Sequence, residues 1–348
     1  MRLLHGRAIS TCIALAFALG AGCRAIVDIE PLEEGTDATG STGGGASSAQ
    51  SSSGTGGADV GSGVGGSGGC DQACGPEILA QGIDTPGRLA VRAGYVYWVV
   101  FGGSAIQRVA VGGGSVETLA EGESNPAGIA VGDTHVYWGN FSDHTLKRVG
   151  LGGGAKELLG VASANANGVA LGGGFFYWAS TAPDGAIERV PLGGGAVETV
   201  AAAQASPTSL ALDDEHVYWN TSDSIQRAAL PSGPPETFSA DGGANNFASD
   251  ATHLYWTSLA GTVSKMPKSG GPEVELATGL SRPHGIAVDT THVYWTDPDD
   301  GLVTRIALDG SDLEILADNQ FTPDHIALDQ THLFWSNSGQ GTIVRLPK

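Results

Sequence analysis

Residues 135–138 read His-Val-Tyr-Trp, and close variants of this tetrapeptide recur along the whole second part of the chain. Each variant ends in one of the seven tryptophans, which follow one another at intervals of about 40 residues. They are Trp98, Trp138, Trp178, Trp219, Trp256, Trp295 and Trp335. A period of this length indicates an array of repeated structural units, so it decides the fold.

Each repeat contains four short apolar runs. In residues 123–161 these runs are 129–131, 135–138, 146–151 and 156–159, and Gly, Asp, Asn and Pro separate them. Such runs are typical of strands bounded by turns. Four strands in a unit of this length predict an all-β fold, the β-propeller, built from four-stranded antiparallel blades.

Charged pairs support the expected hairpin between the third and fourth strands. A two-residue turn at Gly112-Gly113 places Arg108 opposite Glu117, where opposite charges stabilise an antiparallel pair. In the fifth unit Lys265 replaces the arginine, and Glu273 and Glu275 flank the partner position. The same spacing gives the pairs Arg148–Glu157, Arg189–Glu198, Arg227–Glu236 and Arg305–Glu314.

The two ends of the array complement each other. The seventh unit stops after its third strand, near Arg345, whereas residues 77–82 (EILAQG) match the fourth strand at residues 117–122 (ETLAEG). We therefore predict seven blades over residues 70–348, with the last blade closed by the N-terminal strand and Glu77 facing Arg345. Closure of the ring removes the exposed sheet edge.

The segment HVYWTD at residues 292–297, with PHGIAVD before it and RIALDG after it, resembles the YWTD repeats of low-density-lipoprotein-receptor-type propellers. The resemblance covers about residues 76–348, although those propellers usually have six blades. The wider superfamily, with its NHL-type, gluconolactonase-like and streptogramin-lyase-like members, is similar at the same level. The resemblance implies a propeller, a fold that hosts many unrelated activities.

The N-terminal residues predict export. Residues 1–22 combine a basic start with a short apolar run, as a signal peptide does. Gly20-Ala21-Gly22-Cys23 resembles a bacterial lipobox, so Cys23 is a candidate lipidation site at the cell envelope, with simple secretion as the alternative. Arg24 favours the outer membrane or cell surface over the inner membrane. Residues 23–69 are rich in Gly and Ser and predict a flexible linker.

Two cysteines stand where this linker meets the first strand. In an exported protein Cys70 and Cys74 favour a disulfide, whereas a metal site is the weaker interpretation because further ligands are missing nearby. The formal charge of −20 disfavours nucleic acid and anionic lipid as partners. We expect a monomer whose partner is a protein or a glycan.

When the residues that recur in every repeat are set aside, few residues remain as candidates for catalysis or ligand binding. Five histidines, His135, His216, His253, His292 and His332, share one repeat position and are expected to be scaffold. The starts of the inner strands should instead meet at one mouth of the central channel. The predicted ligand-binding residues there are Arg88, Asn167, Asn245, His284, Asp324 and His325.

Within this set, His284, Asp324 and His325 could hold a divalent cation or act as acid and base, although a hydrated channel lining is the favoured interpretation. His144 could join this cluster, but chance placement on the surface is favoured. The acidic run 297–301 (DPDDG) could bind calcium, but an ordinary turn is favoured. We expect a surface-tethered binding propeller rather than an enzyme. The alternative is a metal-assisted hydrolase or lyase of the gluconolactonase-like or streptogramin-lyase-like type.

Overall fold

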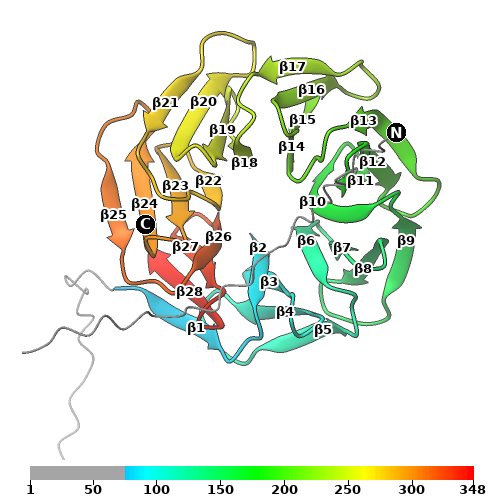
Figure 1. Cartoon of the computed structure of the whole chain (residues 1–348). Coiled ribbons are helices and arrows are strands. Elements are labelled where there is room, and N and C mark those ends of the chain that lie inside the picture. The colour runs from blue at the N-terminus through cyan, green and yellow to red at the C-terminus, as the bar shows by residue number, and fades with distance from the viewer. Residues whose placement is uncertain (1–74) are drawn as a thin grey trace, which may run out of the picture. The chain divides into compact units, whose positions relative to one another are not determined.

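The apolar runs form strands, and the strands form a ring of blades (Figure 1). The structure is a computed structural model, and it describes residues 75–348. Seven four-stranded antiparallel sheets surround one central channel, as predicted. The predicted signal peptide, the linker and Cys23, Cys70 and Cys74 lie outside the described residues.

The four strands of each blade occupy equivalent positions around the ring. The innermost strands, which contact one another from blade to blade, are β2 (Pro86–Arg92), β6 (Pro126–Val131), β10 (Asn165–Gly172), β14 (Leu210–Leu212), β18 (Ala244–Ser249), β22 (Ile286–Val288) and β26 (Pro323–Leu328). The second strands are β3 (Tyr95–Val100), β7 (His135–Asn140), β11 (Phe175–Thr181), β15 (His216–Asn220), β19 (His253–Ser258), β23 (His292–Asp297) and β27 (His332–Asn337). The third strands are β4 (Ala105–Ala110), β8 (Thr145–Gly150), β12 (Gly185–Pro191), β16 (Ile225–Ala229), β20 (Thr262–Pro267), β24 (Leu302–Ala307) and β28 (Thr342–Pro347). The outermost strands are β5 (Glu117–Glu121), β9 (Glu157–Val161), β13 (Glu198–Gln204), β17 (Glu236–Ser239), β21 (Val274–Ala277), β25 (Glu314–Ala317) and β1 (Glu77–Gln81). We number the blades 1 to 7 from the one that contains β2 to the one that contains β26.

The outermost strand of blade 7 comes from the opposite end of the described chain. In Figure 1 the blue β1 lies beside the red β28, and the two pair in antiparallel fashion with Glu77 opposite Arg345. Arg345 Nη2 lies 2.6 Å from Glu77 Oε2. The predicted closure of the ring is therefore confirmed.

The charged pairs of the third and fourth strands are confirmed, but the turn between them is not where we predicted it. Arg108 lies opposite Glu117, and their side chains are 2.7 Å apart. Gly113 N–H donates to the Ala110 carbonyl, so the turn centres on Val111 and Gly112 rather than on Gly112 and Gly113. Gly113 follows with a φ of 88°, a conformation that favours glycine. The corresponding pairs are Arg148–Glu157, Arg189–Glu198, Arg227–Glu236 and Arg305–Glu314, whereas Lys265 lies opposite Val274.

The repeated Tyr-Trp dipeptide builds the core between blades. Successive side chains of a strand point to opposite faces of the sheet, so Tyr97 and Trp98 enter different interfaces. Tyr97 packs with residues of blade 2, including Trp138, and Trp98 packs with Phe334 of blade 7. All seven tryptophans are fully buried. Each blade therefore rests on an aromatic layer that it shares with its neighbour, and the layer between blades 7 and 1 completes the circle.

Buried indole N–H groups need acceptors, and four of the seven obtain one from the segment just ahead of their blade. Glu123, Gln204, Asp241 and Gln320 each accept a hydrogen bond from the tryptophan 15 residues later. Glu123 is also paired with Lys147 and Lys156 at 2.9 and 2.7 Å. Burial alone would raise its pKa, but hydrogen bonds from Asn140 and the two lysines lower the pKa to about 2. This carboxylate therefore stays ionised in the fold.

Removal of β1 tests the closure. A chain that begins at Gly82 should be less stable than one that begins at Gly75 by about 3–5 kcal/mol, because the backbone hydrogen bonds to β28 are lost. Chemical denaturation measures the difference, and size-exclusion chromatography should reveal association through the freed edge of β28. Equal stability of the two chains would contradict the closure.

Candidate functional site at the upper channel mouth

The face on which the inner strands begin carries the polar residues predicted from the sequence. We call it the upper face, and the opposite face the lower face. Five inner strands contain a β-bulge close to this upper end, for example between Pro323 and Ile326 of β26 and between Ala244 and Asn246 of β18. The other bulges lie in β2, β6 and β10. A bulge redirects the side chains around it, so these irregularities decide which residues face the channel.

His284, Asp324 and His325 meet where blades 6 and 7 adjoin. His284 Nδ1 lies 2.8 Å from Asp324 Oδ1, and His325 Nε2 lies 3.8 Å from Asp324 Oδ2. The two imidazole rings are 4.8 Å apart between centroids. Backbone contacts fix the arrangement, since Gly285 N–H donates to the Asp324 carbonyl. The structure thus places these three residues side by side.

Burial and neighbouring charges determine the ionisation of the cluster. Burial alone would raise the pKa of Asp324, but interactions with His325, His284 and Arg88 outweigh it and hold that pKa far below its usual range. Burial lowers the pKa of His325 well below 6.5, and the nearby Arg88 lowers it further while Asp324 opposes the change. At neutral pH the cluster therefore contains a carboxylate beside a neutral His325 imidazole.

A small cavity opens next to this cluster and extends into the channel. Its volume is about 170 Å³, and the polar side chains around it are Arg88, Ser209, Asn246 and His325. Burial lowers the pKa of Arg88, and the charge of Asp324 partly offsets this effect. Asn246 is only 5% exposed, and its Nδ2 has no hydrogen-bond partner among the described residues. A buried amide donor without a partner is costly, so this group is available to a ligand.

Two of the predicted residues do not join the site. Neither Asn167 nor Asn245 makes a hydrogen bond or ion pair to the His284–Asp324–His325 cluster within residues 75–348. Asn245 lies inside the bulge of β18, and it is the next residue, Asn246, that lines the cavity. Ser209 was not predicted either. An alignment of the repeats could have identified Ser209 and Asn246. Like Arg88 and His325, each stands directly before an apolar residue of the inner strand.

The remaining polar candidates have structural partners elsewhere. His144 contacts Asn165 Oδ1 at 2.9 Å, between blades 2 and 3. The buried Asp297 carboxylate accepts hydrogen bonds from the backbone N–H groups of Ser281 and Arg282, so it stabilises a loop. The repeated histidines lie beside the aromatic ring two residues later with the two rings tilted, as His292 lies beside Tyr294 with centroids 6.0 Å apart.

The donor set of the cluster suits a divalent cation only in part. One ligand atom each from His284, Asp324 and His325 can be chosen so that all three lie within 4.8 Å of one another. Neutral imidazole and carboxylate are suitable ligands for such an ion. The positive charge of Arg88, which interacts with Asp324, opposes binding of a second cation.

The propeller is similar to several solved structures. A streptogramin B lyase matches with a TM-score of 0.66 and 15% sequence identity, covering 78% of this chain and 96% of that one. A catalytically inactive variant of virginiamycin B lyase from Staphylococcus aureus, solved with quinupristin, matches with a TM-score of 0.67 and 16% identity over 78% of this chain and 99% of the other. A structure of a nidogen/laminin complex matches with a TM-score of 0.52 and 19% identity over 63% and 92% of the two chains. At these identities the matches establish the fold alone. No protein-family profile and no curated protein matches the sequence.

Proposed function

We propose that the chain is a monomeric binding propeller, tethered to the cell envelope, whose upper channel mouth receives a polar group of a protein or a glycan. The observation that carries the proposal is the unpartnered Nδ2 of Asn246 in the cavity that Arg88 and His325 also line. A carbonyl or hydroxyl oxygen of a ligand would accept from Asn246, and Arg88 would add a charged donor. The nidogen/laminin structure provides a precedent for a propeller in a protein complex.

Substitution of the two candidate amide residues tests this assignment. Ligands are first identified by exposing the full chain to a glycan array and to proteins of the cell envelope. Asn246→Ala should then weaken binding of the identified ligand by about tenfold, because one buried hydrogen bond is lost. The matched control, Asn167→Ala, should leave the affinity unchanged, since Asn167 does not line the cavity. Equal affinities of Asn246→Ala and the unaltered chain, measured by calorimetry, would contradict the proposal.

The His284–Asp324–His325 cluster favours one second candidate, a metal-assisted hydrolase or lyase. The hydrogen-bonded Asp324 would orient His284, and the neutral His325 would serve as a cation ligand or as a base. The fold shared with streptogramin B lyase is compatible with this chemistry. It ranks second because Arg88 adds positive charge next to the ligands and because Asp324 is already paired with His284.

Metal analysis of the purified chain separates the two candidates. If the second candidate is correct, a divalent metal should be present in about equimolar amount and should be lost in both His284→Ala and His325→Ala. His135→Ala, at a scaffold position, is the control that should keep the metal. A chain that binds no metal after incubation with Zn²⁺, Mn²⁺ or Mg²⁺ would count against the enzyme.

The tether is proposed from the leader sequence, in which Cys23 follows Gly20-Ala21-Gly22. Residues 75–348 contain no helix that is long and apolar enough to cross a membrane. We expect mass spectrometry of the chain produced in a bacterial host to find an N-terminus at Cys23 that carries lipid, and Cys23→Ser to release the protein from the membrane fraction. An N-terminus at Cys23 without lipid would indicate simple secretion instead.

A further inference from the structure

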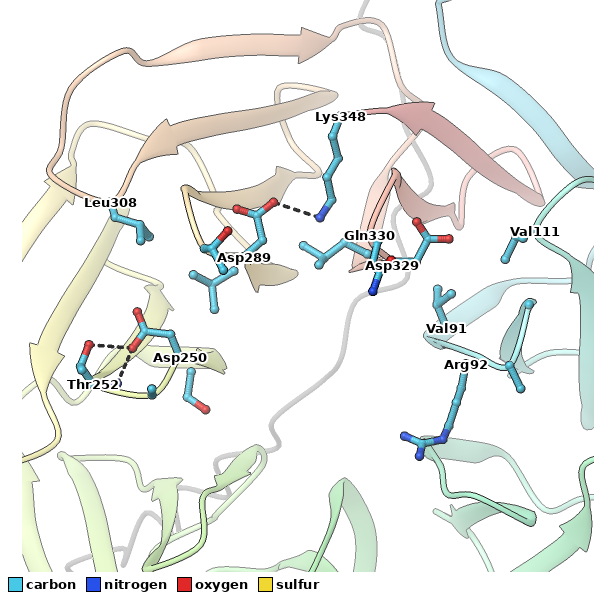
Figure 2. Close-up of a pocket in the computed structure, with 17 residues that line it drawn as sticks. Val91, Arg92, Val111, Asp250, Thr252, Asp289, Leu308, Asp329, Gln330 and Lys348 are labelled. Carbon is cyan, nitrogen blue, oxygen red and sulfur yellow. Dashed lines mark hydrogen bonds and ion pairs between the residues drawn. The ribbon is translucent and has the colours of Figure 1, made fainter.

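A larger pocket lies at the opposite, lower mouth of the channel. Its volume is about 860 Å³, within the range of small-molecule sites, and the turns of blades 5, 6, 7 and 1 surround it. Figure 2 shows side chains from these blades projecting around one opening. The inner-strand residues Val91, Val288 and Leu328 provide apolar surface, to which Val111 and Leu308 add from the turns between third and fourth strands.

Three aspartates of one repeat position stand at this pocket, and they differ in their partners. Asp289 Oδ2 accepts from the Tyr294 hydroxyl and is paired with Lys348 at 2.9 Å. Asp250 Oδ2 accepts from the Tyr255 hydroxyl at 2.7 Å. In blade 7 the tyrosine position holds Phe334, which has no hydroxyl to donate.

Asp329 is therefore the exception among these carboxylates. Its Oδ1 accepts from the backbone N–H groups of Thr331 and His332, as the equivalent oxygen of Asp250 and Asp289 does in blades 5 and 6. Its Oδ2 receives no hydrogen bond and no ion pair from any residue between 75 and 348. One carboxylate oxygen of the pocket is thus left for an external partner.

The cations of the pocket are already engaged. Lys348 neutralises Asp289, as Figure 2 shows, and Arg92 is paired with Asp133 of blade 2. Lys268 of the adjoining groove is paired with Asp213 at 3.1 Å and donates to the main-chain oxygen of Asp250. The charges of Asp250 and Asp329 consequently remain without a paired cation within the described residues, which gives the pocket a negative potential.

We propose that this lower pocket binds an organic cation with an aliphatic body, such as a primary alkyl amine. The ammonium group would donate to Asp329 Oδ2, and the alkyl chain would lie against Val91, Val288 and Leu328. An amine fits better than a hard metal ion, because calcium requires six to eight oxygen ligands and the wall of the pocket is largely apolar. An anion is disfavoured because Lys348 and Arg92 are both occupied.

Three probes of matched size test the class of ligand. Hexylamine, hexanol and hexanoate share the alkyl chain and differ in charge at neutral pH. Calorimetric titration of the full chain should show hexylamine binding to one site, hexanol binding at least about tenfold more weakly, and no binding of hexanoate. Absence of hexylamine binding, or equal binding of hexanoate, would overturn the proposal.

Two substitutions locate the site. Asp329→Asn keeps an oxygen that can accept from the turn, and it should weaken hexylamine binding by about tenfold or more. Phe334→Tyr supplies the hydroxyl present in the other blades, so it should also weaken binding although the net charge is unchanged. Asp184→Asn, an exposed aspartate in a loop of the upper face, changes the charge equally and should have no effect. If both pocket variants bind hexylamine as the unaltered chain does, with tryptophan fluorescence showing that they are folded, the amine site is not at Asp329.

Discussion

The antiparallel pairing of β1 with β28 is the constraint on which the rest of this structure depends. Seven blades share core layers with their neighbours, and Ala80 of β1 belongs to the layer between blades 7 and 1 that also contains Trp98 and Phe334. The pairing of Glu77 with Arg345 repeats at the seam the charge pair found within most other blades. The seam therefore uses the same interactions as the body of the ring, and both channel mouths owe their geometry to it.

Much of the fold follows from the sequence because the same pattern of strands and turns occurs seven times. Any one Tyr-Trp segment could be misread, but its recurrence with Arg and Glu at fixed spacing determines blade number and strand register together. The position of the turn at Val111-Gly112 was misjudged because a run of three glycines fits more than one turn. Acceptors for buried indoles, such as Glu123 for Trp138, were also missed, since the partner lies 15 residues away in an unpatterned loop.

The candidate site was predictable only in part, because β-bulges change which side chains face the channel. His284, Asp324 and His325 were identified because they depart from the repeat at the starts of adjacent inner strands, and the closed ring brings those starts together. The sequence predicted Asn245, whereas the structure places Asn246 at the cavity, because the bulge of β18 lies between Ala244 and Asn246 and redirects the side chains there. The repeat pattern of the sequence does not mark where such a bulge falls.

At both channel mouths, single residues differ between otherwise equivalent blades. At the upper mouth, Arg88 and His325 occupy a position that is Gly128, Gly168 or Gly285 in other blades. At the lower mouth, Phe334 replaces a tyrosine, and Lys348 replaces an apolar residue such as Val111. Phe334 still belongs to the aromatic layer between blades 7 and 1, where it packs with Trp98. Individual repeat positions near a channel mouth can therefore change without loss of the core, which is why departures from the repeat are informative about binding.

The separation of the two strands at the seam also affects how the protein must be made. Glu77 and Arg345 are 268 residues apart, so β1 is synthesised long before its partner β28. Until those residues emerge, β1 can have no native neighbour, and the newly made blades form an open arc with two free ends. Contacts between such distant residues also form slowly. Completion of the circle therefore waits until the strands of all seven blades have been synthesised.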